Sequence, residues 1–203
     1  FSTKVINDKL SINLIPSLGY KKNIGIRRIA DHFNLALNLK KELKRRINNK
    51  PDIVFIGYPP IEISFVAVSF FSKRQIPTVV DVKDLWPKLF LEFFPKSTRP
   101  LVRLALTPYY LMAKLTFQKA TSISAMSQEY INWIYKFSNR DAGESDLITP
   151  LTNKCKINTQ SELMQAEEWW KKYNVNKNNI KRFCFIGYFN SMYDFSIVKL
   201  LAL

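Results

Sequence analysis

The chain has 203 residues, 47% of them hydrophobic, which is enough apolar material for the core of one sizeable domain and part of another. Its two cysteines lie far apart and His32 is its only histidine, which excludes a metal site of the Cys/His kind. The formal net charge is +15, with 12 lysines and arginines against 3 acidic residues in the first 50 positions, and it favours an anionic partner: a nucleic acid, a membrane or a phosphorylated substrate.

The first predicted element is an amphipathic helix over residues 25–47. Its apolar side chains recur mostly three or four positions apart, so they should form one stripe that faces a core. The stripe consists of Ile26, Ile29, Phe33, Ala36, Leu43 and Ile47. Pro51 ends the helix, because proline lacks the backbone N–H that a helix needs.

The second half of this helix carries a basic cluster on its outer face. The cluster consists of Lys40, Lys41, Lys44, Arg45 and Arg46. Cations suit the negative end of the helix dipole, and each one near an anionic surface attracts it further. We therefore expect the cluster to contact an anionic membrane, with an ordinary solvated helix face as the alternative.

Strands and helices alternate after Pro51. Short β-branched runs predict strands over 52–57, 77–82 and 121–126, and longer apolar runs predict helices over 63–74, 101–119 and 128–137. This order is typical of an α/β fold with a Rossmann-like parallel sheet flanked by helices. In such a sheet, ligand-facing groups collect in the loops that leave the carboxyl ends of the strands.

Turn-rich segments suggest how the chain is divided. We expect a first domain over residues 1–160, a helix and linker over 161–181, and the start of a second Rossmann-like domain over 182–203. The chain begins with Phe1 and its last predicted helix has no terminating signal, so we expect it to be cut at both ends. No signal peptide or membrane anchor is visible within it.

The strand ending at Val82 leads into the segment Lys83-Asp84-Leu85-Trp86-Pro87. Asp84 could accept a hydrogen bond from a sugar hydroxyl or take up its proton, and Trp86 could pack on an apolar sugar face. The structural alternatives are that Asp84 caps a helix and that Trp86 belongs to the core.

Two other loops follow strands. Tyr58 and Pro59 lie in a Gly-Tyr-Pro-Pro turn that could present backbone groups to a ligand, or simply connect a strand to a helix. Gly187, followed by Tyr188 and Asn190, lies where a strand meets a helix start, a position suited to binding phosphate. This second loop lacks the glycine pattern of a dinucleotide site and the lysine of a P-loop.

The order of these pieces carries a resemblance. The segments GYKKNIGIRRIADHFNLAL, PDIVFIGYPPIEISFVAVSFFSKRQIPTVVDVKDLWP, TSISAMSQEYINW and FCFIGYFNSMYDF together resemble family-4 retaining glycosyltransferases of bacterial O-antigen or capsular polysaccharide synthesis. The likeness extends over most of residues 19–203. The combination of Pro-Asp before a strand, Tyr-Pro-Pro after it and Asp-Leu-Trp-Pro after the next strand is the most specific part.

The resemblance implies a GT-B fold, in which an acceptor domain and a nucleotide-sugar domain face each other across a cleft. It implies transfer of a sugar from a nucleotide sugar to a lipid-diphosphate-linked saccharide, without a cofactor or a metal. Asp84 matches the family's acidic residue in the cleft, so it is the candidate catalytic residue, with Tyr58, Pro59, Lys83 and Trp86 as candidate acceptor-binding residues.

Gly187, Tyr188 and Asn190 match the opening of the donor domain, although many relatives carry a smaller residue or a glycine where Tyr188 and Asn190 stand. The implied location is the cytoplasm, with the protein held peripherally on the inner face of the cell membrane. The alternative is a basic domain without catalysis that binds nucleic acid or a membrane surface; the chain has no zinc, RNP-like or helix-turn-helix pattern, so we expect no nucleic-acid partner.

Overall fold

The computed structural model describes residues 1–21, 25–46, 48, 50–151 and 159–173. The chain divides into two compact units, Phe1–Thr152 and Asn153–Leu203, and this boundary precedes the predicted one after residue 160. The described part of the second unit contains helix α6, Gln160–Lys172, close to its predicted position. Thr159 and Glu162 form a capping box at its start, because each side chain accepts a hydrogen bond from the other's backbone N–H.

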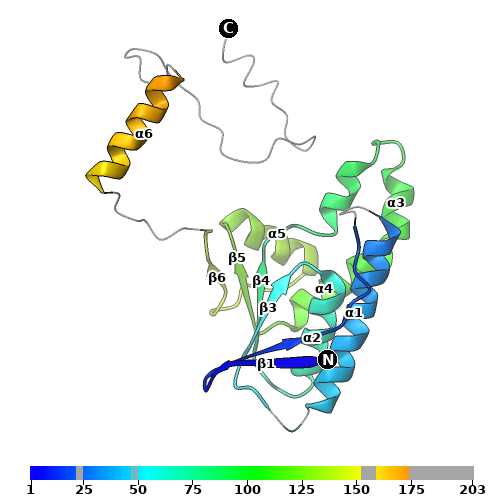
Figure 1. The fold of residues 1–203 in the computed structure, drawn as a ribbon. Coiled ribbons are helices and arrows are strands. Elements are labelled where there is room, and N and C mark those ends of the chain that lie inside the picture. Colours follow the sequence, from blue (N-terminus) through cyan, green and yellow to red (C-terminus); the bar gives the residue numbers. More distant parts are fainter. Residues whose placement is uncertain (22–24, 47, 49, 152–158, 174–203) are drawn as a thin grey trace. The chain divides into compact units, whose positions relative to one another are not determined.

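The first unit is built on a four-stranded parallel sheet with the order β3-β4-β5-β6, which confirms the predicted α/β fold (Figure 1). The strands are β3 Val54–Tyr58, β4 Thr78–Val82, β5 Ser122–Ala125 and β6 Leu147–Ile148. Tyr58 pairs with Val82 and Val82 pairs with Ala125, so the carboxyl ends of β3, β4 and β5 lie level with each other. Of these four strands, only β6 was not predicted, because a run of two residues is too short to show the alternation of a strand.

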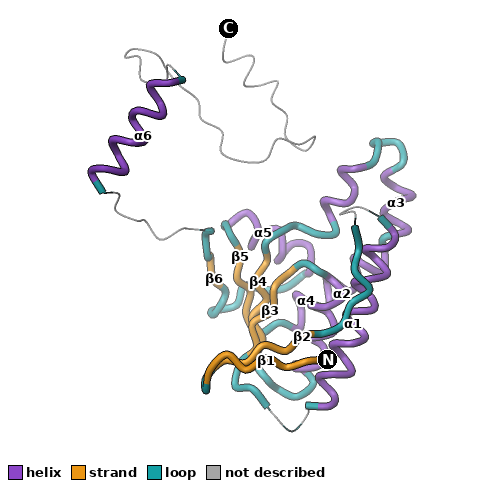
Figure 2. The backbone as a smooth tube through the Cα atoms, viewed as in Figure 1, coloured by secondary structure: helices purple, strands orange, loops and turns teal. Residues whose placement is uncertain are grey.

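Helices α1, α2 and α4 gather on one side of this sheet (Figure 2). The helices of the unit are α1 Ile26–Arg45, α2 Ile61–Ser72, the 3-10 helix η1 Lys88–Phe93, α3 Arg99–Ala105, α4 Thr107–Lys119 and α5 Gln128–Ser138. α2 packs on β3 and β4, α5 packs on β5, and α1 and α4 both pack on α2. The helices therefore form a layer in which neighbours follow chain order, α1-α2-α4-α5, and α2 and α5 contact the sheet directly.

An antiparallel hairpin, β1 Ser2–Asn7 and β2 Leu10–Leu14, precedes α1 and was not predicted. All its side chains are exposed, although Leu10, Ile12 and Leu14 of β2 alternate with polar residues in the way typical of a half-buried strand. The guanidinium of Arg46 donates hydrogen bonds to Thr3 Oγ1 at 3.0 Å and Asn13 Oδ1 at 2.7 Å. The hairpin is thereby attached to the end of α1.

The core lies between the sheet and these helices. Phe117 of α4 is fully buried, and its ring centroid lies 4.8 Å from that of Tyr58 on β3 and 6.3 Å from that of Trp133 on α5. One side chain thus joins a strand and two helices. In such a packed core, removing side-chain volume at Phe117 should lower stability, because the surrounding groups relax only partly into the cavity that is left.

We expect Phe117→Ala to lower the free energy of unfolding by about 3–5 kcal/mol, since it removes a buried ring that packs on Tyr58, Trp133 and Phe137. Urea unfolding followed by circular dichroism measures this change. The matched control is Phe93→Ala, because Phe93 is 50% exposed and should cost less than about 0.5 kcal/mol. Equal losses for the two variants would place the centre of the core elsewhere.

The predicted stripe of α1 faces the core only in part. Ala36 is buried, whereas Ile29 and Phe33 are 44% and 41% exposed, so that part of the prediction was wrong. The helix is rotated so that Asp31 and His32 face inward instead. Both find polar partners: Asp31 accepts a hydrogen bond from the Gly19 N–H, and His32 lies against α2, as described below. Apolar spacing alone does not reveal such a rotation.

The single helix predicted over 101–119 is two helices, α3 and α4, which meet at Leu106. Pro108 lies in the first turn of α4, where its missing N–H costs nothing. Because Pro108 has no N–H to donate to the preceding turn, α3 cannot continue through it, and the break lies at Leu106. Leu101 and Leu104 of α3 are more than 70% exposed, at 72% and 73%.

Candidate functional site

The carboxyl edge of the sheet brings together the loops that follow β3, β4 and β5. Asp84 lies two residues past the end of β4 and its side chain is exposed. Burial and then the charge of Asp84 raise the pKa of Tyr130 on α5 above its usual value, so the carboxylate lies near that hydroxyl. The prediction that Asp84 lies beyond the strand end is confirmed.

The Tyr58 side chain ties two of these loops together. Its hydroxyl donates a 2.7 Å hydrogen bond to the carbonyl of Trp86, and its own carbonyl accepts one of 2.9 Å from the Lys83 N–H. Tyr58 is fully buried, and burial raises the pKa of its hydroxyl, so the group stays a donor. The sequence suggested that backbone groups of this turn meet an acceptor, and that role stays a prediction. The Tyr58 side chain fixes the loop that carries Asp84.

Pro59 follows Tyr58 and is half-buried; the Tyr58-Pro59, Pro59-Pro60 and Trp86-Pro87 bonds are all cis. The backbone of this turn connects β3 directly to α2, where the Ser64 hydroxyl donates to the carbonyls of Gly57 at 3.0 Å and Pro60 at 2.8 Å. The loop is thus held from both sides, and it borders the edge that carries Asp84.

Lys83 points to a different carboxylate from the one next to it in sequence. Its Nζ lies 2.8 Å from Oδ2 of Asp81 on β4, and Oδ1 of Asp81 accepts a hydrogen bond from Ser124 on β5. The Lys83 side chain remains 40% exposed. Asp81 was not singled out in the sequence, because it lies inside the strand rather than after it.

Trp86 is half-buried and packs against the core. Its ring centroid lies 4.6 Å from that of Phe90, and the guanidinium carbon of Arg28 lies 4.9 Å from it. The indole thus has an aromatic neighbour and a cationic one. Arg28, from the first turn of α1, was missed by sequence reasoning, since nothing in its spacing connects it to a loop almost sixty positions later.

A buried polar cluster lies where α1, α2 and α4 meet. The hydroxyl of Tyr109 donates a 2.8 Å hydrogen bond to Glu62 Oε1, and His32 Nδ1 lies 3.6 Å from Glu62 Oε2. His32 and Glu62 are 6% and 2% exposed. The sequence offered two signs of this cluster, a carboxylate at the start of an otherwise apolar helix and the single histidine. Among the described residues, no group of three or more His, Cys, Asp or Glu residues could hold a metal.

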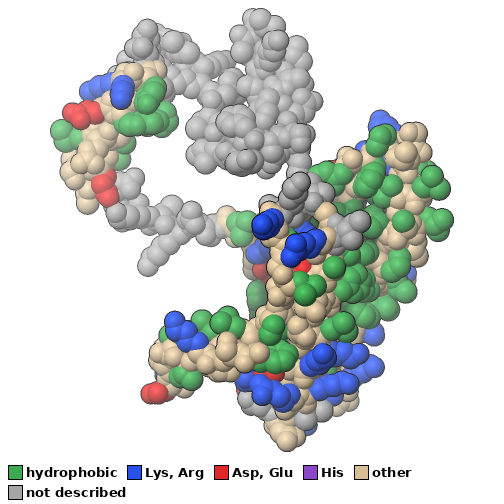
Figure 3. All heavy atoms as spheres, turned by 45° about the vertical axis from the view of Figure 1, so that its right-hand side comes forward, with side chains coloured by type: hydrophobic (Ala, Val, Ile, Leu, Met, Phe, Trp, Pro, Cys, Tyr) green, Lys and Arg blue, Asp and Glu red, His purple; other side chains and the backbone are tan. Residues whose placement is uncertain are grey.

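The basic cluster of α1 is not uniform. Lys40, Lys41 and Lys44 are exposed, whereas Arg45 and Arg46 both bind Glu42, with nitrogen–oxygen distances of 2.8 and 2.5 Å. Figure 3 shows basic side chains gathered at the end of the body where α1 ends. The three lysines are therefore the cations best able to meet an anionic surface.

The ion pairs of Glu42 predict a pH dependence. Hydrogen bonds from Arg45, and then from Arg46, lower the pKa of Glu42 from 4.5 to about 2. Because the folded-state pKa is depressed, the stabilisation is present above about pH 4.5 and lost as the pH falls towards 2. We expect Glu42→Gln to destabilise the protein at neutral pH and the difference from the wild type to shrink over that window. A difference that stays constant in urea titrations from pH 7 to pH 2 would contradict the ion-pair account.

The segment 101–117 is mostly apolar, so it could be either a core helix or a helix that dips into the membrane interface with Tyr109 and Tyr110 at headgroup depth. Tyr109 cannot place its hydroxyl at headgroup depth while it binds buried Glu62, and Tyr110 packs on Phe137 with ring centroids 5.9 Å apart. For α4 the core alternative is therefore correct. Leu101 and Leu104 of α3 remain apolar and exposed. No helix in the described part of the chain is long and apolar enough to span a membrane.

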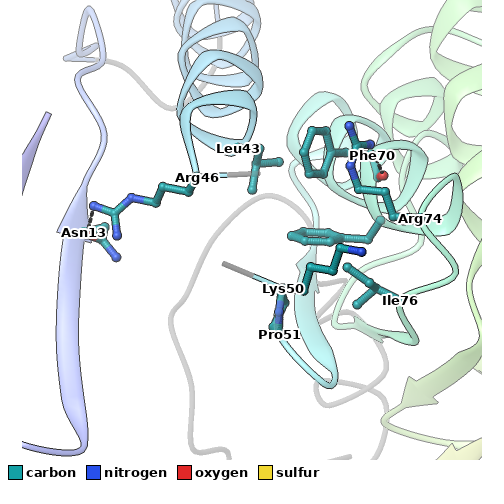
Figure 4. Close-up of a pocket in the computed structure, with 9 residues that line it drawn as sticks. Asn13, Leu43, Arg46, Lys50, Pro51, Phe70, Arg74 and Ile76 are labelled. Atoms are coloured by element: carbon teal, nitrogen blue, oxygen red, sulfur yellow. Dashed lines mark hydrogen bonds between the residues drawn. The ribbon is translucent and has the colours of Figure 1, made fainter. Parts of the chain in front are cut away.

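A pocket of about 250 Å³ lies at the opposite edge of the sheet, between the ends of α1 and α2 (Figure 4). Arg46, Lys50 and Arg74 line it together with apolar side chains. Arg74 donates to the Phe70 carbonyl at 2.8 Å, and its guanidinium lies 3.7 Å from the Phe70 ring centroid. Arg46 is thus already paired with Glu42, and Arg74 is already bonded to a carbonyl in the last turn of α2. The pocket is separate from the edge that carries Asp84.

The candidate donor residues Gly187, Tyr188 and Asn190 lie outside the described residues, as does the predicted second domain over 182–203. Comparison with known protein families finds no family that matches the chain, and comparison with curated proteins finds no match either.

Proposed function

We propose that the chain is the acceptor-side half of a retaining GT-B glycosyltransferase. It would act with a donor domain to transfer a sugar from a nucleotide sugar to a lipid-diphosphate-linked saccharide in bacterial surface polysaccharide synthesis. The observation that carries the proposal is the exposed carboxylate of Asp84 just past β4, on a loop that Tyr58 ties to the neighbouring strand. That is the edge at which open parallel sheets bind their ligands.

Asp84 is suited to act on the hydroxyl of the acceptor. An ionised carboxylate accepts a hydrogen bond from that hydroxyl and takes its proton as the oxygen attacks the donor's anomeric carbon on the face from which the diphosphate leaves, so that the configuration is retained. The bond from that carbon to the nucleotide diphosphate breaks, and the diphosphate leaves with the electron pair. Exposure keeps Asp84 accessible, and the hydrogen bond from Tyr58 to Trp86 limits how far the loop can move.

Trp86 and Pro59 border the same edge and supply apolar surface for a sugar ring. Lys83 contributes in a different way, because its ammonium is paired with Asp81. It would meet an acceptor phosphate only by exchanging that partner. Asp81 thus limits how strongly Lys83 can draw an anion to the edge.

The proposed acceptor carries a lipid, so the protein should work at the inner face of the cell membrane. Exposed Lys40, Lys41 and Lys44 can attract anionic headgroups, and exposed Leu101 and Leu104 can add apolar contact. Localisation would then be cytoplasmic and peripheral.

The test is sugar transfer by a polypeptide that joins this chain to a complete donor domain. A panel of nucleotide sugars is supplied with a lipid-diphosphate-linked monosaccharide, and the product's anomeric configuration is read by NMR. We expect one donor to be transferred with retention. Residues 1–203 alone should not turn over, because the reacting groups come from both sides of the cleft. Inversion would contradict the proposed mechanism, and saturable binding of RNA without any transfer would favour the basic adapter instead.

A further inference from the structure

The buried polar cluster of His32, Glu62 and Tyr109 points towards the candidate site through a chain of contacts. Tyr109 donates to Glu62 Oε1, and Glu62 Oε2 faces His32 Nδ1 at 3.6 Å without a hydrogen-bond partner among the described residues. On the other side of the imidazole ring, His32 Nε2 accepts a hydrogen bond of 3.5 Å from Arg28 Nε. His32 therefore lies between a buried carboxylate and a guanidinium.

These contacts assign the protons. An arginine always donates, so the Nε2 atom that faces Arg28 must be the acceptor of the imidazole. The proton of a neutral His32 is then on Nδ1, directed at Glu62. Burial, and then the hydrogen bond to Glu62, raise the pKa of Tyr109 well above its usual value, so its hydroxyl also stays a donor. Glu62 thus accepts a hydrogen bond from Tyr109 at Oε1, and the His32 Nδ1 atom faces its Oε2 from 3.6 Å.

Arg28 carries the chain of contacts to the site. Its guanidinium carbon lies 4.9 Å from the ring centroid of Trp86 and 5.7 Å from that of Tyr20. Tyr20 in turn meets His32 edge to face, with centroids 6.0 Å apart. Arg28 of α1 is therefore held against the Trp86 indole, while the Tyr58 hydroxyl binds the Trp86 carbonyl.

We propose that His32 is a positioning residue: supported by Glu62 and Tyr109, it holds Arg28 on Trp86 and so fixes the indole of the loop that also carries Asp84. The link itself stands on these contacts, and its role in acceptor binding rests on the proposed glycosyltransferase function. A purely structural cluster would not need this arrangement, because well-packed apolar residues are often as stable as buried charged pairs. An arginine side chain has many rotamers, so a buried anchor at its Nε restricts where the guanidinium lies.

Fluorine NMR on the whole chain labelled with fluorotryptophan tests the link without any substrate. The chain has four tryptophans, and Trp86→Phe identifies the Trp86 resonance. We expect His32→Leu to move and broaden this resonance while the other three keep their positions. Arg28→Gln should do the same, and the double variant should do no more than Arg28→Gln alone, because both act through one guanidinium.

Two further variants keep the test decisive. His32→Gln should leave the resonance in place, because its amide oxygen can still accept from Arg28. Arg27→Gln is the matched control, since Arg27 is exposed on the same turn of α1 and should have no effect. If His32→Leu does not fold, the part-exposed Arg28→Gln variant decides: an unmoved Trp86 resonance, or equal shifts of all four, overturns the link.

Kinetics separate the link from the function on which its role rests. In an active two-domain enzyme, His32→Leu should raise the acceptor KM several-fold with little change in kcat, since it loosens a binding surface and not the base. An inactive enzyme with the expected fluorine shifts would contradict the glycosyltransferase proposal and leave the link intact. Unmoved shifts would overturn the link whatever the enzyme does.

Discussion

Replacing Asp84 with asparagine should lower kcat of the complete two-domain enzyme by about 10²–10⁴-fold, with little change in the acceptor KM. The amide keeps the size and the hydrogen-bonding oxygen of the carboxylate, but it can neither take a proton nor carry charge. Asp84 is exposed and makes no hydrogen bond that supports the loop among those described, so the fold should be unaffected. Initial rates at saturating donor, with circular dichroism to check folding, measure the effect.

Asp52→Asn is the matched control. Asp52 is also exposed, but it precedes β3 at the opposite edge of the same sheet. The same chemical change there should leave kcat within about twofold of the wild type, since the change lies far from the proposed reaction. If Asp84→Asn also leaves kcat unchanged, Asp84 is not the base, and the carboxyl edge loses its proposed chemistry.

Replacing Lys40, Lys41 and Lys44 with glutamine should abolish binding to anionic liposomes at low salt. Each basic residue near an anionic surface contributes about 1 kcal/mol, so three removals cost roughly 3 kcal/mol, on the order of a hundredfold in affinity. Changing Arg45 and Arg46 should matter less, because Glu42 already binds both. Sedimentation with liposomes measures the bound fraction, which should fall as salt rises.

The control for this experiment removes three exposed lysines from other elements: Lys9, Lys119 and Lys136. The net charge changes equally, so a purely global attraction would lose the same affinity in both variants. Equal binding to neutral liposomes would also contradict the electrostatic account. Apolar insertion by Leu101 and Leu104 would then be the explanation, since both are exposed.

The elements that place the site could be predicted because their signals are local. The apolar runs of β3 and β4 are bounded by proline and glycine, and the rule that ligands meet the carboxyl ends of parallel strands puts Asp84 at the edge. Trp86 was found in the same way. What the sequence left open was how each side chain is used: Tyr58 looked like a ligand contact, and its ring is buried beneath the loop.

The remaining features depend on contacts between distant positions. Tyr109 and Glu62 are 47 residues apart, and Tyr58 and Trp86 are 28 apart. No periodicity joins such pairs, because it reports only which face of one element is apolar. Likewise, α1 has apolar residues around much of its surface, and packing on α2 decided that His32 and Ala36 face inward while Phe33 does not.

The most direct test of the account is to map where an acceptor binds. A short-chain lipid-diphosphate-linked monosaccharide is titrated into residues 1–203 while backbone amide resonances are followed by NMR. We predict saturable shifts confined to the loops that follow Tyr58 and Val82, with similar affinity in the Asp84→Asn variant, since that change removes the proposed base and leaves the binding surface in place. Shifts centred on the pocket lined by Arg46 and Arg74 would contradict the assignment of the acceptor site to the carboxyl edge of the sheet.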